Sequence, residues 1–217
     1  MVASRIPLKA AIAIAVLASL YAAAQILSDV SSLKITKIFG YTIDGGTLIY
    51  PITFTLRDLI HKVAGKQVAR ALIVVAALVN LFMAGLFWAV NSLPLLADSG
   101  IQSELFGYVL GPVWRIVLAS ILAEIVSELV DTEVYSAWVT RFGHRKQWGR
   151  VLVSNAVAIP LDSVLFASIA FAGVVSGGVL QEIIITNMVI KGLVTVMSVP
   201  LIYSVRGDAL IVRSNQK

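Results

Sequence analysis

The chain has 217 residues, of which 59% are hydrophobic and 13% are charged, and its mean hydropathy is +0.91. A soluble domain carries about 25% charged residues, so this composition predicts an integral membrane protein. The absence of cysteine excludes disulfides, thiolate catalysis and cysteine-ligated metals. The net charge of +5 does not indicate a nucleic-acid partner, because the basic residues gather in short segments between apolar runs.

Six segments are apolar enough to cross a bilayer, whose hydrocarbon core needs about 20 helical residues. They are predicted at residues 7–27, 45–62, 68–96, 106–131, 151–173 and 180–204. We therefore predict an all-α membrane protein in which residues 1–217 form a single transmembrane domain of six helices. The first segment contains YAAAQ, which is similar to a signal-peptide cleavage site. Its apolar run is long and five more segments follow, so we interpret it as an ordinary first helix.

Small residues form a stripe along the first segment by recurring at every fourth position: Ala11, Ala15, Ser19 and Ala23. Such a stripe lets another helix approach closely. Packing inside the bundle is the simpler interpretation. Docking of a second copy of the chain, or of a separate ATPase module, is the alternative.

The second segment is short for a membrane span. From Thr47 to Ile60 it has 14 residues, about 21 Å of helix against roughly 30 Å of hydrocarbon. It therefore either continues through Lys62 or is partly unwound after the sequence DGG. If the segment is helical, Asp58 and Lys62 form an i, i+4 pair at its inner end.

The distribution of lysine and arginine predicts the orientation of the six segments. With the N-terminus inside, twelve of the 17 basic residues fall in inner segments, three lie within spans, and only Lys34 and Lys37 lie outside. Because inner loops carry the excess of basic residues, we predict that both termini are cytoplasmic. We expect a multi-pass protein of the cell (cytoplasmic) membrane.

Ionisable side chains recur within the apolar segments. A charge at the centre of a membrane helix costs about 2.5–3.5 kcal/mol on insertion scales, so such residues face a protein interior or a wet cavity. The chain has seven of them: Asp58, Arg115, Glu124, Glu128, Asp162, Glu182 and Lys191. The bundle is therefore predicted to have a polar inside.

Depth along the helices suggests partners for these charges. Asp162 and Lys191 each lie about eleven residues into their segments, near the bilayer midplane, so we predict that they pair. Arg115 and Glu182 lie in the outer half and form a second predicted pair. A structural role for the first pair, fixing helix packing alone, stays open.

Further polar residues align with this candidate site. Asn187 stands one turn before Lys191, and Asn155 stands two turns before Asp162. Pro160 lacks an N–H and clashes with the carbonyl of residue 156, so we expect the helix to bend or break beside Asp162. Freed carbonyls next to a carboxylate are typical of midplane sites in transporters.

Several activities are not indicated by the sequence. No GxxxxGK[ST] motif and no HExxH motif occurs, and the two histidines, His61 and His144, lie in or beside basic inner loops. Asp58 and Asp162 differ in depth, which argues against an aspartyl protease dyad. We therefore expect neither an enzyme nor a metal or cofactor site.

Three stretches resemble the VUT family of queuosine-precursor and vitamin uptake transporters. They are LASILAEIVSELVDTEVYSAWVTR, RVLVSNAVAIPLDSVLFASIAF and YPITFTLRDLIHKVAGKQVAR, and the resemblance extends over about residues 10–205. Its most specific part is the Asp162–Ser163 pair in the fifth segment. The resemblance implies a six-helix membrane protein that imports deazaguanine precursors of the modified tRNA base queuosine.

Two departures from the family pattern leave the ligand open. Lys62 and Ala64 stand where many relatives have an acid and a tyrosine, and Ile159 stands where many have a glutamine. Without that glutamine the substrate site lacks an amide, which leaves open a ligand other than a deazaguanine.

We predict a substrate site that combines the aligned polar residues. Its candidate residues are Asp162, Ser163, Lys191, Asn187, Glu128, Asn155 and Arg115, with Asp162 and Glu128 as candidates for a coupling proton. A carboxylate accepts two adjacent N–H groups of a guanine-like edge, and aromatic rings stack on its faces. The candidates for stacking are Trp88, Trp114 and Phe166.

Three hypotheses follow from these residues. The first is a self-sufficient carrier for a small heteroaromatic or vitamin-like solute. The second is a substrate-binding membrane subunit powered by a separate ATPase module that docks on the stripe of small residues. The third is a structural or insertion-assisting membrane protein with a polar groove, which binds no small molecule.

Overall fold

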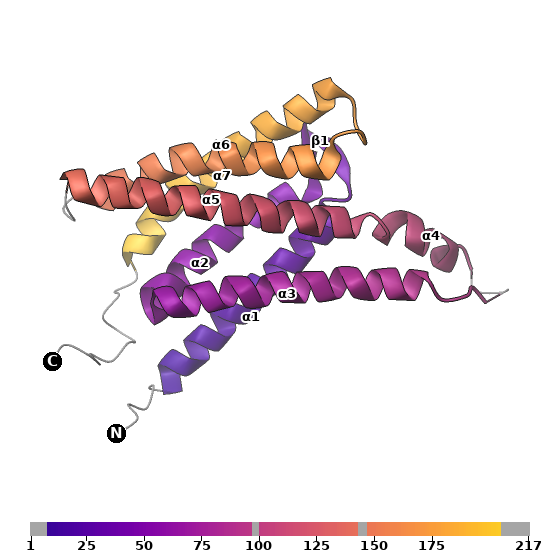
Figure 1. The fold of residues 1–217 in the computed structure, drawn as a ribbon, viewed down its shortest axis with the longest axis horizontal. Helices are drawn as coiled ribbons and strands as arrows, with labels where there is room; N and C mark the ends of the chain where they lie inside the picture. Colours follow the sequence, from indigo (N-terminus) through magenta and orange to yellow (C-terminus); the bar gives the residue numbers. More distant parts are fainter. Residues whose placement is uncertain (1–7, 97–99, 143–146, 205–217) are drawn as a thin grey trace.

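The structure, a computed structural model, describes residues 8–96, 100–142 and 147–204, and it is mostly helical (Figure 1). In chain order its elements are α1 (Leu8–Ser31), β1 (Ile35–Ile38), β2 (Tyr41–Asp44), the 3-10 helix η1 (Gly45–Leu48), α2 (Tyr50–Ala64), α3 (Lys66–Asn91), α4 (Ile101–Leu110), α5 (Val113–Phe142), α6 (Gln147–Phe171) and α7 (Gly177–Ser204). Helix α1 begins and α7 ends on the same side of the molecule (Figure 1).

Within the described residues, five helical stretches are long and apolar enough to cross a membrane. They are Ala11–Ser31, Gln67–Asn91, Ile101–Ser127, Val153–Phe171 and Gly177–Met197. The short second segment is not among them, because α2 has 15 residues, about 22 Å of helix. The start of this segment forms the 3-10 helix η1, and the segment is α-helical from Tyr50 to Ala64. Six spanning helices and the cytoplasmic side of the termini stay predictions.

Two prolines test the predicted helices, and at one of them the prediction is wrong. The fourth segment is not one helix, because α4 ends at Leu110 and α5 begins at Val113, on either side of Pro112, which cannot donate a backbone hydrogen bond. Conversely, α6 is continuous through Pro160, so of the expected bend or break the break does not occur. Helix α6 packs against both α5 and α7, and neighbouring helices allow a proline within a membrane helix.

The hairpin of β1 and β2 corrects the all-helical prediction. The strands pair antiparallel from Ile35 opposite Asp44 to Ile38 opposite Tyr41. Phe39 and Gly40 connect them with φ values of 51° and 86°, the positive φ pair of a type I′ turn. The alternating Ile, Thr and Tyr residues of both strands favour extended backbone, so a period of two was the available sequence signal.

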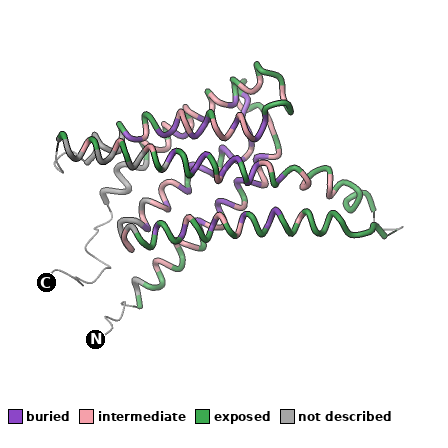
Figure 2. The backbone as a smooth tube through the Cα atoms, viewed as in Figure 1, coloured by how far each residue is buried: buried purple, intermediate pink, exposed green. Residues whose placement is uncertain are grey.

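Three apolar clusters hold the helices together. One joins α1, α2 and α3 around Tyr21 and Ile60, and a second joins α5, α6 and α7 around Ala167 and Ile183. A third, around Val117, joins α3 to α5. Figure 2 shows buried positions on the facing sides of the helices, while much of α3 and the beginning of α1 are exposed. Large exposed apolar side chains on these outer faces suit contact with lipid.

The stripe of small residues on α1 is not packed inside the bundle. Ala11, Ala15, Ser19 and Ala23 are all exposed in the described part of the chain. The simpler interpretation of the stripe is therefore wrong, because the core face of α1 is the opposite one, which carries Tyr21 and Ala24.

Candidate functional site

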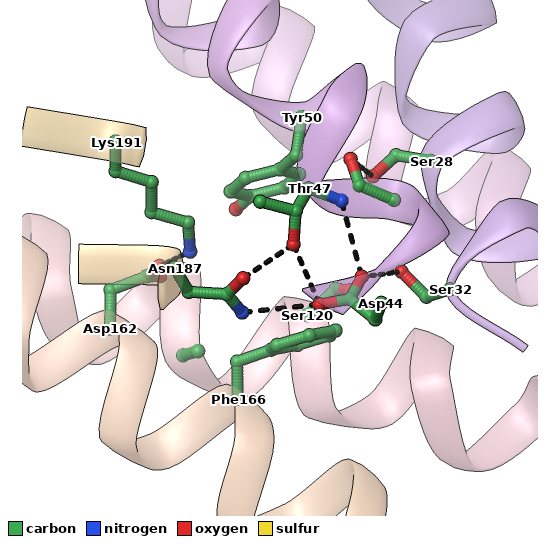
Figure 3. Close-up of a pocket in the computed structure, with 12 residues that line it drawn as sticks. Ser28, Ser32, Asp44, Thr47, Tyr50, Ser120, Asp162, Phe166, Asn187 and Lys191 are labelled. Carbon is green, nitrogen blue, oxygen red and sulfur yellow. Dashed lines mark hydrogen bonds and ion pairs between the residues drawn. The ribbon is translucent and has the colours of Figure 1, made fainter. Parts of the chain in front are cut away.

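A polar pocket lies where the end of α1, the segment from β2 to α2, and helices α5, α6 and α7 meet (Figure 3). Its lining residues are Ser28, Ser32, Asp44, Gly46, Thr47, Tyr50, Ser120, Ala123, Asp162, Phe166, Asn187 and Lys191. The cavity volume is about 10 Å³, room for about one water molecule. The pocket is therefore too small for a molecule larger than water, and we call it the closed pocket.

One side of the pocket is formed by an ion pair between aromatic rings. Lys191 donates to Oδ2 of Asp162, and both side chains are buried. The Lys191 ammonium also lies 4.7 Å from the ring centre of Tyr50 and 5.8 Å from that of Phe166, distances at which a cation is attracted to a ring. The predicted pairing of Asp162 with Lys191 is confirmed.

Two buried oxygen atoms beside this pair have no hydrogen-bond partner among the described residues. They are Oδ1 of Asp162 and the hydroxyl oxygen of Ser163. Leaving a buried acceptor unsatisfied costs about 1–3 kcal/mol, so such atoms are unusual unless a water, an ion or a ligand binds there. The Asp162 carboxylate thus has one oxygen available for a ligand.

The opposite side of the pocket is a hydrogen-bond network centred on Asp44, the last residue of β2. Its Oδ1 accepts from the Ser32 hydroxyl (2.7 Å) and from the backbone N–H of Thr47 (3.2 Å). Its Oδ2 contacts the Thr47 hydroxyl (2.7 Å) and accepts from Nδ2 of Asn187 (3.2 Å). The Thr47 hydroxyl also contacts Oδ1 of Asn187 (Figure 3). Asp44 therefore connects the hairpin and η1 to α7.

Two more buried carboxylates lie between α1 and α5. Asp29 accepts from Ser120 (2.7 Å), and its other oxygen has no partner in the described structure. One turn along α5, Glu124 accepts from the Tyr21 hydroxyl (2.8 Å). These two buried hydrogen bonds join α1 to the centre of α5.

Several predicted site residues come together and others do not. Asp162, Asn187, Lys191 and Phe166 line the pocket, and Ser163 is buried next to Asp162. Asn155 is half-buried and outside the pocket lining. The side chains of Glu128, Asp58 and Lys62 lie outside the described residues. The other stacking candidates point away, since Trp88 and Trp114 are 72% and 55% exposed.

Arg115 and Glu182 do not pair as predicted. The Arg115 guanidinium donates from Nε to the carbonyl of Ile169 and from Nη2 to that of Ala172, and each of these hydrogen bonds is 2.6 Å long. Glu182 instead accepts from the Thr42 hydroxyl in β2. Depth alone placed the two charges together, but Arg115 satisfies the free carbonyls at the end of α6, which lack helical partners.

The sequence prediction missed the pocket residues that lie before residue 51 and two more on α5. The missed residues are Ser28, Ser32, Asp44, Gly46, Thr47, Tyr50, Ser120 and Ala123. One signal was available: Ser28 and Ser32 share a face at i, i+4 spacing near the end of an apolar helix, and DGGT follows soon after. No signal indicated that the hairpin folds back to bring Asp44 to Asn187.

The arrangement is suited to binding and not to metal chemistry. Among the described residues, no group of three His, Cys, Asp or Glu side chains could hold a metal ion. The pocket instead combines a carboxylate with a free oxygen, an amide, hydroxyl groups and two aromatic rings. A few convergent polar groups beside aromatic surface are the usual composition of a small-molecule site.

Comparison with known proteins supplies the family. Residues 44–205 match the sequence profile of a family described as "Putative vitamin uptake transporter". No curated protein and no solved structure matches the chain. The matched range includes both sides of the pocket, from Asp44 to Lys191, and most of the helices able to cross a membrane. The chain therefore belongs to the VUT family of vitamin uptake transporters and is a multi-pass membrane protein.

Proposed function

We propose that the protein imports a small heteroaromatic solute of the deazaguanine (queuosine-precursor) class through the pocket at Asp162. The observation that carries this proposal is the unpartnered Oδ1 of Asp162, buried beside the rings of Tyr50 and Phe166. A guanine-like edge presents two adjacent N–H donors, which one carboxylate binds together, and its ring stacks on aromatic side chains.

In the closed pocket, Lys191 occupies the place of the solute. Its ammonium neutralises Asp162 and lies against the faces of the same two rings. An entering solute replaces it with two N–H donors and a stacked ring, while Asn187 supplies an amide for a carbonyl group. Because the cavity holds about one water, binding requires the helices around the pocket to separate.

The test is uptake of a labelled deazaguanine precursor by liposomes that contain only this protein, with and without a proton gradient. We expect accumulation that depends on the gradient, and none in liposomes without protein. Clear binding without uptake would contradict the self-sufficient carrier and favour the ATPase-powered subunit. The absence of both binding and uptake would reject this solute class. That result would agree with the departures from the family pattern at Lys62 and Ile159.

The exposed stripe of α1 favours the partner-powered subunit as a second candidate. Ala11, Ala15, Ser19 and Ala23 present a face on which another helix can pack closely. An Ala15→Leu variant would then lose a co-purifying ATPase module, or a second copy, and keep its solute affinity. Ile12→Leu, at an exposed position beside the stripe, is the matched control.

A further inference from the structure

A second group of polar side chains is buried beside the pocket, where α1, α3 and α5 pack against one another. Asp29 of α1 is 1% exposed, and its Oδ1 accepts a hydrogen bond of 2.7 Å from the Ser120 hydroxyl of α5. Its Oδ2 is buried and has no hydrogen-bond partner among the described residues. Ile26 and Val30, on either side of Asp29 in α1, pack into the apolar cluster that joins α3 to α5.

Asn80 of α3 supplies a second buried oxygen of this kind. Its side chain is 3% exposed, and its Oδ1 also has no hydrogen-bond partner in the described part of the chain. Buried polar atoms nearly always have a partner in the protein, in bound water or in a bound ion. Two such acceptors on neighbouring helices, Asp29 and Asn80, therefore point to something that binds both.

The packing of the apolar cluster places Asn80 at the depth of Asp29 and Ser120. Met83 of α3 and Val117 of α5 belong to this cluster. Asn80 stands one turn before Met83, and Ser120 stands one turn after Val117, each on the same helix face as its apolar neighbour. Because α3 and α5 run in opposite directions (Figure 1), both steps lead the same way along the bundle. Asn80 therefore lies at the level of Ser120, to which Asp29 is hydrogen-bonded.

The Asp29 carboxylate also lacks a positive partner within the described residues. The buried Lys191 is paired with Asp162. Arg115, the basic residue of α5 nearest to Ser120 in sequence, donates to carbonyls at the end of α6. Buried charges in proteins are paired with an opposite charge or coordinate a metal ion. A cation bound at Asp29 would satisfy both the charge and the free oxygen.

We propose that Asp29, Ser120 and Asn80 bind an alkali-metal cation between α1, α3 and α5. Carboxylate and amide oxygens are ligands of hard cations, and the Ser120 hydroxyl keeps a lone pair after donating its hydrogen to Asp29. The single carboxylate supplies one negative charge, which a monovalent cation balances and a divalent cation would exceed. Glu124, the next acid along α5, is directed to the Tyr21 hydroxyl instead.

The cation site adjoins the pocket through two shared elements. Ser120 lines the pocket, and so does Ser28, the residue before Asp29. A cation that joins α1 to α5 at this point therefore fixes one wall of the pocket. On the proposed transport function, the cation and the solute then favour each other's binding, because coupling between two sites is reciprocal.

Thermal unfolding of the purified protein in detergent tests the site without any solute. At equal ionic strength, Na⁺ or K⁺ in place of choline is expected to raise the melting temperature, because an ion that binds only the folded protein stabilises it. At about ten times its Kd, the ion should raise the melting temperature by roughly 3–5 °C for a chain of this size. Equal melting temperatures in all three salts would overturn the proposal. That result is expected if the Asn80 amide simply donates to Asp29.

Two variants assign the effect to these residues. Asp29→Asn keeps the shape and removes the charge, so its melting temperature should no longer respond to Na⁺ or K⁺. Asn80→Ala should weaken the ion's affinity at least about tenfold, since even contacts that only support a metal ligand have such an effect. Glu133→Gln, which removes an exposed carboxylate of α5, is the control and should respond like wild type. A full response in Asp29→Asn would overturn the proposal.

A direct measurement needs no variant. In equilibrium dialysis, saturable binding by wild-type protein is expected for radioactive Na⁺ or for Rb⁺, which replaces K⁺. Absence of binding for both ions would overturn the proposal even if Asp29→Asn did not fold.

The coupling to the pocket has its own readout. Equilibrium binding of the labelled deazaguanine precursor should be at least about fivefold tighter in the stabilising salt than in choline. Asp29→Asn should bind the precursor equally in both salts. Equal affinities in wild type would overturn the coupling. If wild-type protein binds no precursor in any salt, the proposed function fails, while melting temperatures and dialysis still decide whether the cation binds.

Discussion

Lys191 of α7 and Asp162 of α6 form an ion pair in which each side chain is only 3% exposed. Removing one member of a buried pair leaves the other charge uncompensated, which costs about 3–5 kcal/mol. Replacing both members removes both charges, and the loss is then smaller. The pair therefore makes a testable contribution to stability, separate from any role in binding.

We expect Lys191→Met and Asp162→Asn each to lower the free energy of unfolding by about 3–5 kcal/mol. The double variant should lose less than the sum of the two single losses. Denaturant unfolding in detergent micelles measures all three values. Additive losses would show that the two side chains do not interact.

Asp162→Asn should abolish solute uptake in protein that still inserts into the membrane. The amide has one acceptor oxygen beside an NH₂ donor, so it cannot bind two adjacent N–H groups side by side, and the proposed recognition of a guanine-like edge is lost. Uptake per inserted molecule in liposomes is the measurement. Glu133→Gln, an exposed acid on α5, is the control, and full uptake by Asp162→Asn would reduce Asp162 to a packing role.

Phe166→Leu should weaken solute binding about tenfold, equivalent to about 1.4 kcal/mol, because base–aromatic stacking contributes about 1–3 kcal/mol. The matched control is Phe87→Leu, since Phe87 packs edge-on against Phe106 away from the pocket. Equilibrium binding of the labelled precursor measures both. Equal affinities of the two variants would argue against stacking on Phe166.

Arg115→Met should destabilise the protein by on the order of 1 kcal/mol and leave solute affinity unchanged. Its two hydrogen bonds go to carbonyls at the end of α6, and bonds to charged groups contribute about 1.5–3 kcal/mol when buried. Partial exposure of Arg115 reduces that value. Thermal unfolding and binding are measured on the same samples. A weakened affinity at unchanged stability would contradict this expectation and support Arg115 as a substrate-binding residue.

Gly46→Ala should destabilise the closed pocket by about 1–3 kcal/mol, the usual effect of overpacking. A Cβ at Gly46 would lie 2.0 Å from Oγ of Ser32 and 2.6 Å from the carbonyl oxygen of Ser28. Gly192→Ala, next to Lys191, is the control because nothing lies within 4 Å of its Cβ position. Thermal unfolding compares the two, and equal melting temperatures would contradict this tight contact.

The sequence by itself determined the membrane character, the approximate positions of the five helical stretches able to cross a membrane, and four of the pocket residues. Asp162 and Lys191 could be paired from depth alone because both helices are regular and their rise per residue is constant. The family could be identified from the same stretches. Helical periodicity and hydropathy are local properties, so they can be read without knowing how the helices pack.

The tertiary structure alone decided the other half of the pocket. The hairpin turns at Phe39 and Gly40 and folds back to bring Asp44 to Asn187, 143 residues further along the chain. Depth counting also failed for Arg115, because a helix end with free carbonyls lay closer than the expected acid. Such partners depend on contacts between distant segments, and a pattern within one segment carries no information about which distant side chain satisfies a buried charge or hydroxyl.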